Sequence, residues 1–126
     1  MTIRRREFLA ACVLVLSTAC HSATGLDRDR LLQRLEKEIL GHPVTGQIVY
    51  LAPQPLKGGD SVHAWRFEHN IPKDYGATLF LFVDEQPGAN WEHAASYVFI
   101  DQASNRFQVE PGRTPPDNLP TFQRLN

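Results

Sequence analysis

Four side chains that could bind a ligand or take part in catalysis alternate along one short segment. They are spaced two residues apart and are His63, Trp65, Phe67 and His69. Residues at this spacing point to the same face of a β-strand. Two imidazoles flanking two aromatic rings could grip a sugar, a peptide or a metal ion. Alternatively, the two aromatic residues belong to the core, and the histidines lie at the margins of a sheet.

A second group of such residues follows a predicted turn at Pro87-Gly88 and comprises Trp91, Glu92 and His93. Binding residues often lie on loops of this kind. Glu92 could act as an acid or base, and His93 could shuttle a proton. The alternative is that Trp91 closes one end of the core, while Glu92 and His93 are solvated.

A metal site would need a third ligand to join His63 and His69, and His93 is the best candidate. The sequence contains neither a cysteine pair in the folded part nor a His-Glu-x-x-His motif. It also lacks a Gly-x-Ser-x-Gly nucleophile motif and a phosphate-binding glycine loop. We therefore predict no metal or cofactor, and we assign no catalytic residue.

The elements that position these residues change character along the chain. Residues 27–40 form a predicted amphipathic helix, because Leu31, Leu35 and Ile39 recur every four residues. From residue 44 onward the period is two, and we expect strands over residues 47–51, 62–68, 78–83, 96–101 and 105–109. The sequence thus predicts an α+β fold, in which one N-terminal amphipathic helix packs on a mainly antiparallel sheet of about five strands.

Asp84 and Asp101 each follow or end a predicted strand. If these strands are antiparallel neighbours, the two carboxyl groups lie at opposite ends of the sheet, and a paired-carboxylate mechanism is disfavoured. Four prolines follow Val109, and we expect this C-terminal segment to be extended and loosely held. The predicted division is a signal peptide at 1–19, a tether at 20–25, a single α+β domain at 26–110 and a proline-rich tail at 111–126.

The first twenty residues have the organisation of an export signal. Three arginines precede a nine-residue apolar segment, which is too short to span a bilayer. Arg5, Arg6, Phe8 and Leu9 resemble the core of a twin-arginine signal, which would imply export of a folded protein. Export through the general secretory route is the alternative.

Residues 17–20 resemble the lipobox of bacterial lipoproteins, which implies that Cys20 is lipidated and becomes the first residue of the mature protein. Ser17 departs from the usual aliphatic residue, and simple cleavage after Ala19 is the alternative. These resemblances predict a bacterial exported lipoprotein in the periplasm, anchored to the outer membrane through Cys20 or otherwise secreted.

Charge and cysteine content argue against a nucleic-acid partner and against an internal disulfide. Without residues 1–19 the chain has 10 basic and 13 acidic residues with no basic stripe, so a nucleic-acid partner is not expected. Both cysteines, Cys12 and Cys20, precede the folded part, which must therefore be stable without an internal disulfide.

Three functions remain open. The first is a non-catalytic binding or scaffolding protein of the cell envelope, in which Trp65 and Trp91 contact an envelope protein or a small ligand. The second is a small hydrolase or metal-dependent enzyme that uses His63, His69 and His93. The third is an inhibitor of an envelope enzyme, with the exposed loop 86–91 as its contact. Residues 97–109 resemble the closing hairpin of small secreted bacterial domains related to protease propeptides, and this motivates the third function.

Overall fold

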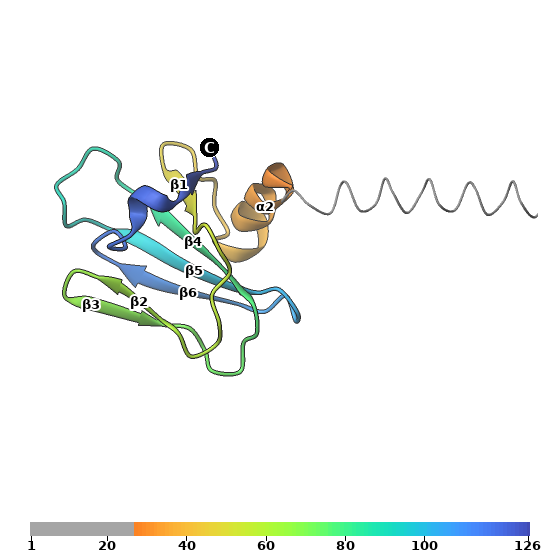
Figure 1. Ribbon diagram of the computed structural model, residues 1–126. Coiled ribbons are helices and arrows are strands. Elements are labelled where there is room, and N and C mark those ends of the chain that lie inside the picture. The colour runs from red at the N-terminus through yellow and green to blue at the C-terminus, as the bar shows by residue number, and fades with distance from the viewer. Residues whose placement is uncertain (1–26) are drawn as a thin grey trace, which may run out of the picture. The chain divides into compact units, whose positions relative to one another are not determined.

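The computed structural model describes residues 27–126 (Figure 1). The predicted signal peptide, the lipidation site Cys20 and the tether lie outside these residues. The sheet and all the residues of the candidate site belong to one compact unit, Leu32–Asn126. Within the described part of the chain, no helix has both the length and the apolar character needed to cross a membrane.

One short helix lies in the range predicted for it. It comprises the α-helix α2 (Arg28–Arg34) and a following π-helical turn, η1 (Leu35–Ile39). Asp27 Oδ1 accepts the Arg30 N–H at 3.1 Å, which is the bond of an N-cap. Gly41 ends the helical segment at φ +75°, a conformation that glycine adopts without steric cost.

A five-stranded antiparallel sheet follows, as the sequence predicts. Its strands span Ile48–Leu51 (β1), Thr78–Asp84 (β4), Ala95–Asp101 (β5), Phe107–Gly112 (β6) and Gln123–Arg124 (β7). Their order in the sheet is β6-β5-β4-β1-β7, so β1 lies between β4 and the C-terminal strand β7.

The register of β4 and β5 separates the two aspartates. Thr78 pairs with Asp101, and Asp84 pairs with Ala95 at the other end, so the expectation of distant carboxyl groups is confirmed. Asp101 serves the β5–β6 turn, where it accepts the Ser104 hydroxyl at 2.6 Å. This hydrogen bond lowers the pKa of Asp101.

The predicted strand over residues 62–68 is wrong, because the chain reverses in its middle. Two short strands, β2 (Ser61–Ala64) and β3 (Phe67–Asn70), form a hairpin around the two-residue turn Trp65-Arg66. Val62 pairs with His69, whereas His63 pairs with Glu68. His69 is therefore on the inner face of the hairpin with Val62, and His63 is on the outer face. The four alternating residues do not share one face, as a single strand would require.

The buried core lies between the hairpin and one face of the sheet. Phe80 and Phe82 of β4 interleave with Tyr97 and Phe99 of β5, and ring centroids are 5.2–5.5 Å apart in three of the pairs. Val62 and Ala64 of the hairpin pack against these aromatic rings and cover them. The buried residues of this core are Val62, Ala64, Ile71, Phe80, Phe82, Ala95, Tyr97 and Phe99.

The expectation of a loosely held C-terminal tail is also wrong. After β6, a short 3-10 helix, η2 (Leu119–Thr121), leads into β7, which pairs with β1 at the sheet edge. Leu125 is buried, and its N–H donates to the Val49 carbonyl at 2.8 Å. Phe122 packs edge-on against Phe80 with centroids 5.4 Å apart. Apolar residues near the C-terminus outweigh the prolines, which only restrict the path of the backbone.

Candidate functional site

Three large aromatic side chains gather at one end of the unit and remain open to solvent. We call Trp65, Phe67 and Trp91 the aromatic cluster. The Trp65 and Trp91 rings meet edge to face with centroids 4.6 Å apart, and Phe67 lies 6.3 Å from Trp65. Their exposed fractions are 46%, 37% and 54% in sequence order. The two tryptophans that the sequence singles out separately therefore form one surface (the turn of β2–β3 and the β4–β5 connection in Figure 1).

Trp65 stands in a backbone conformation that bulky residues avoid. Its φ is +59°, in a turn position where glycine is the usual residue. The Trp65 N–H donates to Asp117 Oδ1 at 2.8 Å, across 52 residues of sequence. Such a conformation costs about 1–3 kcal/mol and persists only where its surroundings hold it. A strained residue that stays exposed is a candidate for function.

The segment after β6 clamps the turn that carries Trp65. The Asp117 N–H donates to the His63 carbonyl at 2.9 Å, and Thr114 Oγ1 donates to the Ala64 carbonyl at 3.0 Å. Thr114 is itself buried. Together with the Trp65–Asp117 bond, these contacts join three successive residues of the hairpin to the C-terminal segment.

Trp91 is presented on the connection between β4 and β5, which is anchored at its base by His93. The His93 N–H donates to the Arg113 carbonyl at 2.8 Å. On the side chain, Nε2 donates to Asp84 Oδ1 at 2.7 Å, and Nδ1 donates to the Asn90 carbonyl. His93 is thus a positioning residue for the loop, and the predicted solvated role is wrong for its half-buried ring.

The charged form of His93 is favoured by this arrangement. Both ring nitrogens face groups that can only accept, so the doubly protonated imidazolium satisfies both bonds. Burial opposes the charge, but the hydrogen bonds to Asn90 and Asp84 outweigh it, and the pKa of His93 is raised above its ordinary value.

Charged side chains border the aromatic cluster. The Arg66 guanidinium lies over the Trp65 ring, 4.0 Å from its centroid. Next to Trp91, Glu92 Oε1 accepts the Arg113 Nε–H at 2.9 Å. Glu92 therefore takes part in an exposed ion pair, which stabilises the fold only slightly.

Phe67 and His69 both line a cleft of about 440 Å³. Nδ1 of His69 donates to Glu110 Oε2 at 3.0 Å, because a carboxylate can only accept. The imidazole stacks on Tyr97 with centroids 3.8 Å apart. These contacts fix the orientation of the ring, so His69 is held within the wall and does not belong to the exposed surface.

The three histidines of the enzymatic alternative take separate places. His69 pairs with Glu110 and His93 with Asp84, while His63 faces outward on β2. Among residues 27–126, no group of three or more histidine, cysteine or acidic side chains is arranged to hold a metal ion. The structure does not bring these histidines to the common point that the enzymatic alternative requires.

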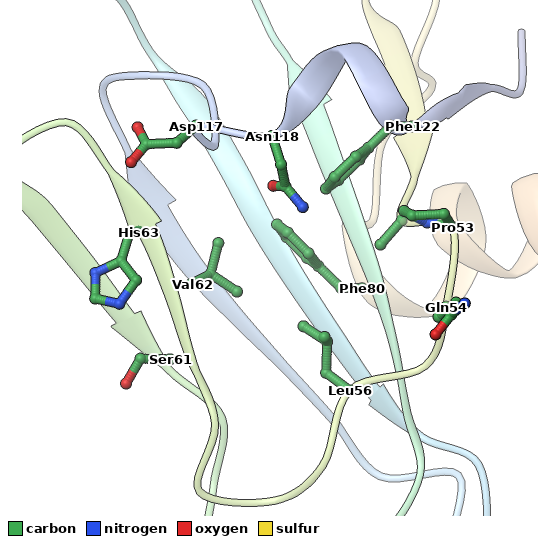
Figure 2. Close-up of a pocket in the computed structure, with 11 residues that line it drawn as sticks. Pro53, Gln54, Leu56, Ser61, Val62, His63, Phe80, Asp117, Asn118 and Phe122 are labelled. Carbon is green, nitrogen blue, oxygen red and sulfur yellow. The ribbon is translucent and has the colours of Figure 1, made fainter.

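A separate pocket of about 450 Å³ lies beside the hairpin (Figure 2). Its lining comes from the β1–β2 connection, from β2 and β4, and from the segment around η2. Sequence reasoning missed this pocket, because it depends on the C-terminal segment folding back over Phe80. The residues that line it are Ala52, Pro53, Gln54, Leu56, Ser61, Val62, His63, Phe80, Asp117, Asn118 and Phe122.

Comparison with known proteins found no matching family model, no matching curated protein and no matching solved structure.

Proposed function

We propose that this chain is a small exported protein of the bacterial cell envelope that binds a partner protein through the aromatic cluster and does no catalysis. The observation that carries the proposal is the exposure of Trp65 and Trp91 in edge contact, on a turn and a loop that are both fixed from beneath. Tryptophan is over-represented at binding hot spots, and a preorganised contact surface loses less entropy on binding.

Two features favour a protein partner over a small molecule at this surface. Trp65 is at the tip of a hairpin, so it is presented outward to a partner. The flanking Arg66 and the Arg113–Glu92 pair give the aromatic centre a charged border, which resembles the polar rim of protein interfaces.

The location of the protein is part of the proposal. We infer that the leader directs export and that a lipid on Cys20 holds the folded part at a membrane surface. The proposal rests on the arginines, the short apolar segment and the cysteine of the sequence. Mass spectrometry of the mature N-terminus tests it, and a Cys20→Ser variant is the control. Recovery of the intact leader without an acyl group would contradict this part.

We also infer that the helical residues 32–39, which belong to the same compact unit as the sheet, cover the sheet face opposite the hairpin. Val49, Leu81, Val83 and Val98 are fully buried on that face. Leu35 is fully buried on the helical segment as well, and Arg34 Nη2 donates to the Asn105 carbonyl at 2.6 Å. With both faces covered, the open aromatic cluster is not explained by an unfinished core.

Capture of the partner in the native host tests the binding function. The full-length protein is cross-linked in cells, and the partner identified with the wild type is then quantified for Trp65→Ala and Trp91→Ala. A hot-spot tryptophan contributes about 2 kcal/mol or more, so we expect at least a roughly 30-fold loss of affinity. The matched control is Phe107→Ala, since Phe107 is also a large exposed side chain but belongs to the edge strand β6.

Either of two results would overturn the proposal. One is unchanged affinity in both tryptophan variants. The other is loss of cooperative unfolding in them, which would make the cluster a part of the core. If the captured partner is an enzyme and loses activity on binding, the protein is an inhibitor that uses the same surface, because Trp91 belongs to the 86–91 loop.

A further inference from the structure

The pocket of Figure 2 is formed by apolar side chains that converge from residues 52–62, from β4 and from the segment around η2. Leu56, Val62, Phe80 and Phe122 surround its centre, and the Asn118 amide lies above Phe80. Ser61 and His63 also belong to the lining and lie on the other side of β2 from Val62. The pocket thus has an apolar body with neutral polar side chains at its border, and of these the Asn118 amide, which can both donate and accept a hydrogen bond, lies next to Phe80.

The walls are fixed by hydrogen bonds of the backbone. The Leu56 N–H donates to the Thr78 carbonyl at 2.8 Å, and the Thr78 N–H donates back to the Leu56 carbonyl at 2.7 Å. On the opposite wall, the Phe122 N–H donates to the Leu119 carbonyl at 2.9 Å. The pocket is therefore formed before any ligand enters, as is usual for small-molecule sites of this size.

The charge of the lining restricts the ligand. Among the described residues that line the pocket, none is a lysine or an arginine. The acidic residue in the lining, Asp117, uses Oδ1 to hold the Trp65 N–H. An anionic ligand would find no lysine or arginine to compensate its charge, with only the titratable His63 at the border, and would meet the Asp117 carboxylate at the rim.

We propose that this pocket binds a small uncharged molecule with an aromatic or short aliphatic body and one polar end. The body lies against Phe80 and Phe122, and the polar end bonds the Asn118 amide. This site is separate from the partner surface of the proposed function, and neither proposal depends on the other.

Two fluorescent probes with the same ring system test the proposal on the full chain. N-phenyl-1-naphthylamine is uncharged and carries one N–H, and 1-anilinonaphthalene-8-sulfonate adds a single negative charge. We expect saturable one-to-one binding of the neutral probe, at least about 10-fold tighter than that of the sulfonate. Equal affinity for the two probes would overturn the proposed ligand class.

Variants place the probe. Leu56→Trp fills the pocket and should reduce affinity for the neutral probe at least about 10-fold. Asn118→Leu has a side chain of similar volume but no amide. It should reduce the affinity for the neutral probe about 3- to 10-fold, as expected for one lost hydrogen bond. Phe107→Ala is the matched control and should leave affinity unchanged, because Phe107 is an exposed aromatic residue of β6 outside the pocket. Undiminished binding in Leu56→Trp, or loss of binding in Phe107→Ala, would overturn the site. Cooperative thermal unfolding verifies that each variant is folded, and Asn118→Leu, which changes only an exposed side chain, decides the matter if Leu56→Trp fails to fold.

Discussion

Two groups of aromatic side chains within one compact unit differ sharply in their surroundings. Phe80 and Tyr97 represent the closed group, with exposed fractions of 1% and 0% beneath the hairpin. Trp65 and Trp91 represent the open group, in contact with each other but half exposed. The hairpin separates the two, because its inner face covers the closed group while its turn carries Trp65.

The difference indicates two roles for the same class of residue. The closed group stabilises the fold by burial. The open group is only partly buried, and one of its members, Trp65, keeps a strained backbone conformation. If this distinction is correct, mutations in the two groups must separate folding from recognition.

The largest effect is expected for Phe80→Ala in the closed group. Removal of a fully buried ring leaves a cavity, and such changes cost about 3–5 kcal/mol. The free energy of unfolding, measured by chemical denaturation, should fall by this amount. A loss below about 1 kcal/mol would show that the two groups do not differ in their contribution to stability.

A much smaller change in stability is expected for Trp65→Gly in the open group. Glycine adopts the positive φ without steric cost, which stabilises the fold. It also raises the conformational entropy of the unfolded chain and loses the edge contact with Trp91, and both of these destabilise the fold. These contributions oppose one another, so the unfolding free energy should change by no more than about 1 kcal/mol. Partner capture should nevertheless be lost. A destabilisation as large as that of Phe80→Ala would place Trp65 in the core.

The smallest expected effect is on how the stability of the fold depends on pH, through His93 at the base of the loop that carries Trp91. The pKa of His93 is raised in the folded protein, so its stabilising bonds are fully present below the ordinary value of 6.5. This contribution is lost as the pH rises through the folded-state pKa. We expect the NMR titration of His93 to lie above 6.5, and the free energy of unfolding to fall slightly as the pH rises through that titration.

His93→Gln should remove this part of the pH dependence, and His63→Gln is the matched control, because His63 faces outward. If His93 titrates at or below 6.5, the ordinary pKa of histidine, this result would contradict an imidazole that donates one hydrogen bond to Asp84 and another to Asn90.

Local sequence signals predicted most of the sheet but not the hairpin. The runs 47–51, 78–83 and 96–101 have strong strand patterns, and each forms a strand. Residues 62–68 have the same pattern, and Trp65-Arg66 contains no glycine, asparagine or aspartate to mark a turn. The turn depends on Asp117, a partner that no local window contains.

The candidate site was therefore predicted by residue type but not by arrangement. The sequence names Trp65 and Trp91 as contact candidates, and that role stays a prediction, while their proximity depends on the chain reversal and on the β4–β5 register. The pocket depends on Phe122 and Asn118, which lie in a segment whose prolines favoured a loose tail. Both misses arise from contacts between distant parts of the chain.

The clamp formed by Thr114 and Asp117 makes the timing of synthesis matter. A ribosome delivers these residues about fifty positions after the hairpin turn that they hold. Until they emerge, the hydrogen bonds that hold the turn around Trp65 cannot form. A partner that contacts both tryptophans would thus bind the exported protein only after residues 114–117 have docked on the hairpin, and would not bind a chain clipped before Thr114.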